Sequence, residues 1–215
     1  MDTSDSPYSA SKLFDLDKTI LSAAFDNEQP AWEILTVLEK EVLALGNILD
    51  SDYINTCESI WVHKNANIAK GVTINGPAII CCGAELRPGA YIRGPVLVGK
   101  NAVVGNSTEV KNAVLFDGVS IPHFNYVGDS VLGAMSHLGA GAILSNVRLD
   151  TQHITIKHAG IKIETGLRKF GALVGDNVQI GCNAVINPGT IIGRNAFIYP
   201  LKNAGGVIGE GEKIY

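Results

Sequence analysis

One histidine of this sequence stands in a context suited to acid–base chemistry. His123 begins the run His-Phe-Asn-Tyr-Val-Gly-Asp, and an imidazole with its ordinary pKa near neutrality can accept a proton during a reaction. Taken alone, such a histidine is more often a hydrogen-bonded structural residue. Upstream, Arg87 offers a bidentate fork and Lys111 a point charge, and either can hold an anion. What these side chains can do depends on the elements that position them.

The cysteines give no sign of a metal or redox centre. Cys57, Cys81, Cys82 and Cys182 show neither a Cys-x-x-Cys pair nor zinc spacing. Cys81 and Cys82 are adjacent, so on a strand their side chains would point to opposite faces and act as small hydrophobic residues. We expect a reducing environment, with the cytoplasm as the default, and no metal.

The region that carries these side chains has an apolar residue at every sixth position, for ten positions in a row. A fixed six-residue period indicates a solenoid, in which each short strand turns one branched residue inward and a Gly-, Asn- or Pro-rich turn follows. Three such strands complete a triangular coil. The sequence therefore predicts a left-handed parallel β-helix of the hexapeptide-repeat kind. The positions are Val62, Ile68, Ile74, Ile80, Leu86, Ile92, Val98, Val104, Val110 and Phe116.

The six-residue period is interrupted twice. After Phe116 it slips by four and resumes through Tyr126, Leu132, Leu138 and Leu144. A longer gap separates this series from a last one that runs from Val174 to Ile198. Residues 147–169 are therefore predicted to form an inserted loop at one edge, rich in lysine, arginine and histidine, and such loops often lie over a binding site.

Residues 1–55 follow a different pattern and predict an N-terminal helical cap. Trp32, Leu35, Leu38, Val42 and Leu45 recur at helical spacing. A Pro two residues before this stripe and a Gly after it fit the ends of a helix. A shorter helix is predicted over residues 9–25. We expect both to cover the open end of the first coil, which would otherwise expose unpaired strand edges. The β-helix domain is expected over residues 56–215.

Composition excludes several classes of protein. Apolar residues make up 46% and charged residues 18% of the chain, which excludes disorder. A net charge of −4 without a basic run argues against nucleic-acid binding. No apolar run approaches the ~20 residues of a membrane span, and no secretory signal is visible. Residues 51–215 nevertheless hold fourteen basic and eleven acidic residues, a balance that suits an anionic ligand.

Several runs of the repeat region resemble a known family, the acetyltransferase domain of the bifunctional bacterial N-acetylglucosamine-1-phosphate uridyltransferase/glucosamine-1-phosphate acetyltransferase. The stretch from Asn146 to Gly171 is more similar still to archaeal and other sugar-phosphate nucleotidyltransferases with the same C-terminal domain. Residues 1–55 contain no Gly-rich nucleotide loop, so uridyl transfer is not expected. The other runs are Leu86–Ala90, Gly105–Ala113, His123–Ser130 and Gly139–Gly141.

The resemblance implies N-acetylation of an amino-sugar phosphate such as glucosamine 1-phosphate by acetyl-CoA. Such a transfer needs a base for the amine proton and donors for the thioester oxyanion. In this family His123 would be the base, with Asn146 beside it in catalysis. The sugar phosphate would be bound by Arg87, Lys111, Tyr126, His137 and, from an adjacent chain, Lys169.

The resemblance also implies a homotrimer with acetyl-CoA bound between chains, against Gly139, Ala140 and Cys182. Three positions depart from the family pattern: His137 replaces an Asn, Val147 a Tyr, and Cys182 a small hydroxyl residue. These departures leave open a different acceptor, such as galactosamine 1-phosphate or a nucleotide-linked amino sugar. They also leave open an inactive trimeric scaffold or sugar-nucleotide-sensing subunit.

A metalloenzyme on the same fold is the remaining alternative. The γ-class carbonic anhydrases bind zinc or iron through three histidines, and neutral imidazoles suit zinc. Two of the five histidines fall in the irregular loop, and the spacing does not match that class. The five are His63, His123, His137, His153 and His158.

Overall fold

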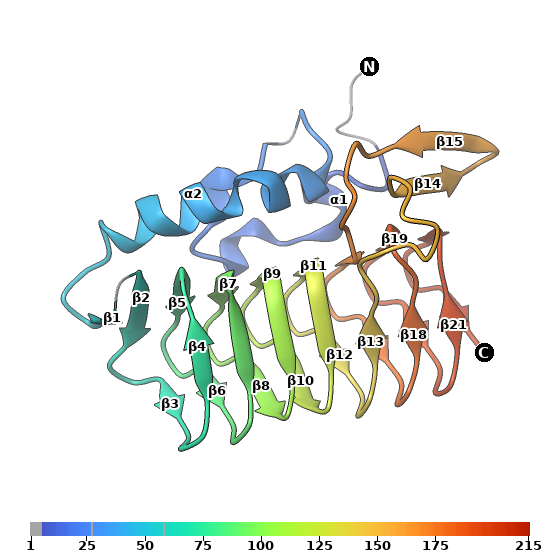
Figure 1. The fold of residues 1–215 in the computed structure, drawn as a ribbon. Helices are drawn as coiled ribbons and strands as arrows, with labels where there is room; N and C mark the ends of the chain where they lie inside the picture. Colours follow the sequence, from blue (N-terminus) through green and yellow to red (C-terminus); the bar gives the residue numbers. More distant parts are fainter. Residues whose placement is uncertain (1–5, 27, 58) are drawn as a thin grey trace.

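The computed structural model describes residues 6–26, 28–57 and 59–215. Parallel strands wind into a β-helix of about nine coils, as the hexads predict. Helices and a hairpin lie along one side of it (Figure 1). None of the described helices is long and apolar enough to span a membrane.

Eight short parallel strands form one side of the β-helix, which we call the histidine face because it carries His123 and His137. Each strand pairs with its counterparts in the neighbouring coils. In spatial order they are β3 (Asn67–Ile68), β6 (Glu85–Leu86), β8 (Val103–Asn106), β10 (Ser120–His123), β12 (His137–Leu138), β17 (Gln179–Ile180), β20 (Phe197–Ile198) and β23 (Lys213–Ile214).

A thirteen-stranded sheet makes the other two sides, because three long strands turn the edge between them. These are β7 (Tyr91–Val98), β9 (Glu109–Leu115) and β11 (Tyr126–Leu132). Their first halves form what we call the second face, with β4 (Thr73–Asn75), β13 (Ile143–Leu144), β18 (Val185–Ile186) and β21 (Asn203–Ala204). Their second halves form what we call the covered face, with β1 (Tyr53–Cys57), β2 (Ile60–His63), β5 (Ala78–Ile80), β16 (Ala172–Val174), β19 (Thr190–Ile192) and β22 (Val207–Ile208).

The interior follows the hexads with two corrections. Ile80 pairs with Val98 eighteen residues later, but Val98 pairs with Leu115 after only seventeen. One residue is lost at the edge of β9, where Asn112 adopts a positive φ of 45°. The predicted inward positions Phe116 and Tyr126 are therefore wrong by one residue, and Leu115 and Val127 occupy the core instead. Tyr126 is left half-buried on the second face.

The covered face has apolar side chains on both of its surfaces. In β5, β16, β19 and the second halves of β7, β9 and β11, three consecutive residues are buried, so the middle residue, which alternation turns outward, must be covered. Its outward column contains only apolar residues. They are Trp61, Ile79, Leu97, Val114, Val131, Leu173, Ile191 and Val207.

The N-terminal segment lies along the β-helix, not over its first coil, so the expected end cap is wrong (Figure 1). Helix α2 (Ile34–Gly46) packs on β5, β7 and β9. The predicted helix over 9–25 is reduced to α1 (Ala10–Leu13) and two 3₁₀ turns, η1 (Leu16–Lys18) and η2 (Ser22–Ala24), and a third turn, η3 (Ala31–Glu33), precedes α2. The outward apolar column explains this placement. Residues 1–5 of the prediction lie outside the described residues.

At the first coil a strand takes the expected position of the helices. Strand β1 pairs antiparallel with β2 and covers its free edge. The rest of the coil stays open, since Ile68 is 37% exposed. The predicted division of the chain at residues 55 and 56 stays a prediction.

The insertion at residues 147–169 is built around an antiparallel hairpin of β14 (Thr155–His158) and β15 (Ile161–Glu164). It continues the line of the N-terminal segment over the last coils (Figure 1) and contacts β22. Ile154 and Ile156 are buried beneath it. The hairpin therefore covers the part of the apolar column that the N-terminal segment leaves free.

Candidate functional site

His123 ends β10 and lies at one edge of the histidine face, in a column of residues from successive coils. The Gly141 N–H donates to the His123 carbonyl at 3.0 Å, and the Asn183 N–H donates to the Ala140 carbonyl at 2.9 Å. These bonds stack His123, Ala140 and Cys182 in three neighbouring coils, each about 4.8 Å from the next. The structure thus brings the predicted base and two predicted coenzyme-binding residues together.

Two glycines beside this column border a groove. A Cβ on Gly139 would lie 2.7 Å from the Cys182 backbone nitrogen, and a Cβ on Gly181 would collide with the Pro200 nitrogen. Both positions therefore require glycine. The close approach of the next coil fills the space that a side chain would need. Beside it His137, Gly139 and Cys182 line a cavity of about 370 Å³ together with Phe197 and Tyr199.

The two histidines of this face differ in their surroundings. The His123 side chain is exposed, and its ring makes no hydrogen bond or ion pair with a described residue. Its backbone N–H donates to Asn125 Oδ1 at 3.2 Å. Burial, and next the nearby His123, lower the pKa of His137. His123 is therefore the freer of the two to meet a substrate, and His137 is held neutral.

Asn125 is a structural residue of this site that the sequence analysis did not single out. Its side chain is buried, and Nδ2 donates to the carbonyls of Gly139 at 2.8 Å and Ala142 at 3.2 Å. It ties the turn after His123 to the turn of the next coil. Phe124, which lies between His123 and Asn125, is 63% exposed. Its positive φ of 52° is a strained conformation for a bulky residue. The feature of the sequence that points to Asn125 is its place in the His-x-Asn-Tyr run.

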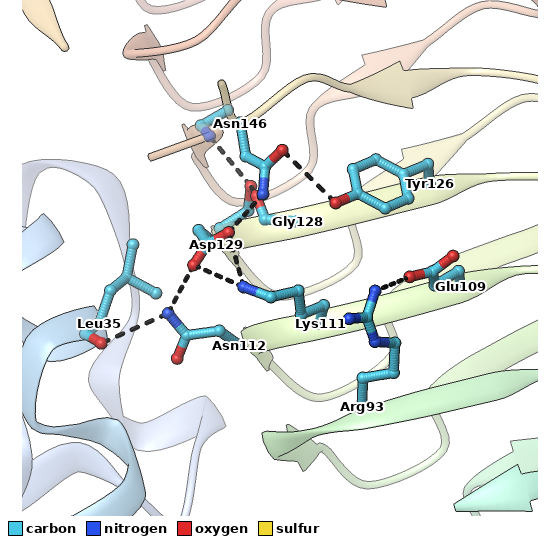
Figure 2. Close-up of polar contacts among 11 residues, drawn as sticks. Leu35, Arg93, Glu109, Lys111, Asn112, Tyr126, Gly128, Asp129 and Asn146 are labelled. Carbon is cyan, nitrogen blue, oxygen red and sulfur yellow. Dashed lines mark hydrogen bonds and ion pairs between the residues drawn. The ribbon is translucent and has the colours of Figure 1, made fainter. Parts of the chain in front are cut away.

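A second group of predicted residues surrounds a buried carboxylate where β9 and β11 turn from the second to the covered face (Figure 2). Lys111 Nζ lies 3.1 Å from each oxygen of Asp129. Asn112 Nδ2 donates to Asp129 at 2.9 Å, and Asn146 Nδ2 donates to its other oxygen. The Asp129 side chain is only 5% exposed. We call Lys111, Asn112, Tyr126, Asp129 and Asn146 the Asp129 cluster.

Hydrogen-bond direction in the Asp129 cluster determines what Tyr126 presents. Asn146 uses its amide nitrogen on Asp129, so its oxygen accepts from the Tyr126 hydroxyl at 3.4 Å. Burial, aided by Glu109 and then Asp129, raises the pKa of Tyr126 and keeps the phenol protonated. The hydroxyl donates its hydrogen to Asn146, so its oxygen remains free to accept a hydrogen bond from a ligand.

The remaining predicted cations lie apart. Arg87 is two coils before His123 and forms a fork with Glu85 at 3.0 and 3.2 Å, which raises its pKa. Lys169 is exposed beside Phe170, whose N–H donates to the Asn146 carbonyl at 3.0 Å. Arg87 and Lys111 are thus already paired with carboxylates, whereas Lys169 has no described partner.

Apart from Arg87 and Lys169, the predicted site residues therefore fall into two groups on two faces of one chain. His123, His137, Gly139, Ala140 and Cys182 share the histidine face. Lys111, Tyr126 and Asn146 belong to the second face and its edge. Three histidines, or other groups of three metal-binding side chains, do not come together anywhere in the described residues, so the carbonic anhydrase geometry is not found there.

Two family descriptions match consecutive parts of the chain. Residues 74–169 match the GMPPB C-terminal domain, and residues 171–200 match the bacterial transferase hexapeptide of six repeats. The boundary between the two matches falls where the insertion ends and the hexads resume.

Curated relatives extend the likeness. A bifunctional sugar-1-phosphate nucleotidylyltransferase/acetyltransferase of Sulfurisphaera tokodaii is 39% identical over 77% of this chain and 46% of its own length. The bifunctional protein GlmU of Methanococcus vannielii is 34% identical over 66% of this chain and 38% of its own. This chain thus spans less than half of these relatives. The putative uncharacterized acetyltransferase YaiX of Escherichia coli is 30% identical over 77% of this chain and 71% of its own length.

Proposed function

Because the chain belongs to the hexapeptide-repeat acetyltransferase family, we propose that it transfers an acetyl group from acetyl-CoA to the amine of an amino-sugar phosphate. The observation that carries this proposal is the column of His123, Ala140 and Cys182 beside a groove lined by glycine. In this arrangement the His123 imidazole, which has no partner among the described residues, lies next to a groove that the extended arm of the coenzyme can enter. Glucosamine 1-phosphate is the acceptor that we propose first.

His123 acts as the general base. Its exposed imidazole can take the proton that the acceptor amine loses as nitrogen attacks the thioester carbonyl. The proton moves to the ring as the C–N bond forms. The C–S bond then breaks, and the ring passes the proton to the departing sulfur, so that the coenzyme leaves as a thiol and the imidazole is neutral again. The lowered pKa of His137 keeps a second positive charge away from the protonated ring.

Acetyl-CoA occupies the groove on the histidine face. The pantetheine arm is narrow and carries amides, so it fits the cavity of about 370 Å³, where Gly139 and Gly181 leave the strand backbone within reach. Cys182 follows Gly181 in the next coil and lines the same cavity. Phe197 and Tyr199 would pack against the apolar part of the coenzyme.

The Asp129 cluster orients the acceptor. The Tyr126 oxygen, as an acceptor of hydrogen bonds, suits a sugar hydroxyl. Asn146 holds that tyrosine and lies beside Lys169, whose unpaired ammonium suits the sugar phosphate. The charge of Lys111 is neutralised by Asp129, so we expect Lys111 to contribute less to phosphate binding than Lys169. Arg87 would have to leave or share Glu85 to reach a phosphate.

The division of the site between two faces favours an assembly with sites between chains. If the histidine face of one chain meets the second face of the next, both groups border one cleft. Such a head-to-tail contact closes into a ring when the rotation permits, and a homotrimer is the state that we propose.

A direct assay separates this function from an inactive scaffold. Thiol release from acetyl-CoA would be followed with glucosamine 1-phosphate, galactosamine 1-phosphate and a nucleotide-linked amino sugar. We expect turnover with at least one of them and a faster rate with the phosphorylated amino sugar than with free glucosamine. Release no faster than the uncatalysed rate with every acceptor, from folded protein, would favour the scaffold.

A further inference from the structure

The insertion between Asn146 and Phe170 holds a cavity that the proposed acetyl transfer does not use. It lies between the β14–β15 hairpin and the preceding segment, and its volume is about 880 Å³. Its walls are polar side chains throughout. They are Arg148, Thr151, Gln152, His153, Thr155, Lys157, Lys162, Glu164 and Arg168.

The two surfaces of the hairpin explain why the cavity is polar. Ile156 faces Ile163 across the strands, and these residues pack towards the β-helix. Alternation puts their neighbours on the opposite surface, where Lys157 lies directly opposite Lys162. The apolar surface anchors the hairpin, and the polar surface lines the cavity.

The paired lysines are an unfavourable arrangement without a counter-ion, because like charges directly opposite on antiparallel strands repel. Lys162 is compensated by Glu164 at 2.7 Å. The side chains of Lys157 and Arg168 make no hydrogen bond or ion pair with a described residue. The lining as a whole carries four positive side chains and one negative.

We propose that this hairpin cavity binds a doubly charged phosphate group, either a phosphomonoester or the diphosphate of a sugar nucleotide. A dianion would neutralise Lys157 and Arg168 together and relieve the repulsion between Lys157 and Lys162. His153 and the hydroxyl and amide groups of Thr151, Gln152 and Thr155 supply further hydrogen bonds. The lining offers no Phe, Tyr or Trp ring on which a base could stack, so recognition rests on the phosphate.

None of the residues that line this cavity has a role in the proposed acetyl transfer, so the two proposals can fail independently. The hairpin packs on β22 of the covered face, whereas His123 lies on the histidine face. The lysines are also exposed, so dissolved salt screens them. Binding should therefore weaken steeply as ionic strength rises.

Calorimetric titration tests the proposal with inorganic phosphate and inorganic pyrophosphate as the probes. The wild-type protein should bind at least one of them at low ionic strength, and the preferred probe distinguishes the monoester from the diphosphate. Replacing Lys157→Gln together with Arg168→Gln should weaken binding about tenfold or more, since each removes a charge-assisted hydrogen bond. The single variant Lys157→Arg, which keeps the charge, should bind within about threefold of wild type.

The matched control is the pair Lys70→Gln and Lys100→Gln, exposed lysines outside the insertion. It removes the same net charge and should leave binding unchanged. Hydrogen exchange localises the effect, because the hairpin amides should slow when pyrophosphate is added. The proposal is overturned if neither probe binds, if both double variants weaken binding equally, or if exchange slows elsewhere but not in the hairpin.

Discussion

At the scale of single residues, the most informative group is a carboxylate that does no chemistry itself. Asp129 receives the ammonium of Lys111 and the amides of Asn112 and Asn146 (Figure 2). Asn112 also donates to the Leu35 carbonyl of α2 at 3.4 Å. Asp129 therefore fixes the orientation of Asn146, and through it the hydroxyl of Tyr126, while it joins the site to the N-terminal segment.

Replacing Asp129→Asn should disturb acceptor binding more than it disturbs the fold. The amide that replaces the carboxylate has one accepting oxygen where the carboxylate has two. It cannot accept hydrogen bonds from Lys111, Asn112 and Asn146 at both positions, so the Asn146 side chain is free to rotate. We expect the KM for the amino sugar to rise about tenfold or more, with acetyl-CoA affinity little changed. Steady-state kinetics and calorimetry would measure the two quantities.

Asp176→Asn is the matched control for this prediction. Asp176 is also buried, accepts backbone N–H groups of Asp15 and Ala134, and pairs with Arg194, but touches no predicted site residue. Both variants should lose about 1–3 kcal/mol of unfolding free energy. An acceptor KM that rises equally in both would mean that Asp129 has only a structural role.

At the scale of elements, the hexads predicted most of the β-helix and failed at one edge. The failure has a physical cause, since losing one residue at Asn112 or Asp129 shifts every later side chain without breaking the strand. The position of the N-terminal segment was also missed. A stripe of apolar residues at helical spacing shows that one side of a helix is buried, but it does not show which surface of the protein buries it. The signal lay in apolar triplets such as Val96-Leu97-Val98, which are typical of strands buried on both sides.

The site could be predicted in part for the same reason. His123 was expected as the base, and Ala140 and Cys182 as coenzyme-binding residues. Only the coil register, with the hairpin insertion between Ala140 and Cys182, stacks the three. Asp129 was missed as a site residue because an aspartate after Gly normally indicates a solvated turn.

Phe14→Ala tests whether the N-terminal segment is held by the covered face. Phe14 is 2% exposed, and its ring lies 5.1 Å from that of Phe116 and 6.0 Å from that of Phe25. Truncation should cost about 3–5 kcal/mol of unfolding free energy in denaturant titration. Phe124→Ala, an exposed phenylalanine, should change it by less than about 0.5 kcal/mol. Similar losses in both variants would refute this account of the packing.

At the scale of the whole molecule, the proposed site needs two chains. The histidine face and the second face are different sides of one β-helix. His123 and Asn146 can therefore act on the same acceptor only if one chain contributes His123 and a neighbouring chain contributes Asn146. A solution mass three times that of the chain is expected. A monomeric mass at micromolar concentration would contradict both the trimer and the shared site.

Mixed assemblies test the sharing of sites. Chains carrying His123→Ala and chains carrying Asn146→Ala should each be nearly inactive alone. Unfolded together and refolded, they should recover part of the wild-type activity, because some clefts then combine an intact His123 with an intact Asn146. If the mixture stays as inactive as its components, each site lies within one chain.

The central claim is that His123 is the base in acetyl transfer, and the turnover number of His123→Ala tests it most directly. With saturating acetyl-CoA and amino-sugar phosphate, kcat should fall by about 10²–10⁴, while calorimetry should show acetyl-CoA affinity nearly unchanged. His158→Ala, a histidine in the hairpin, should retain wild-type kcat. A His123→Ala variant whose kcat stays within about threefold of wild type would contradict the account and leave the base to another residue, with His137 the next to test.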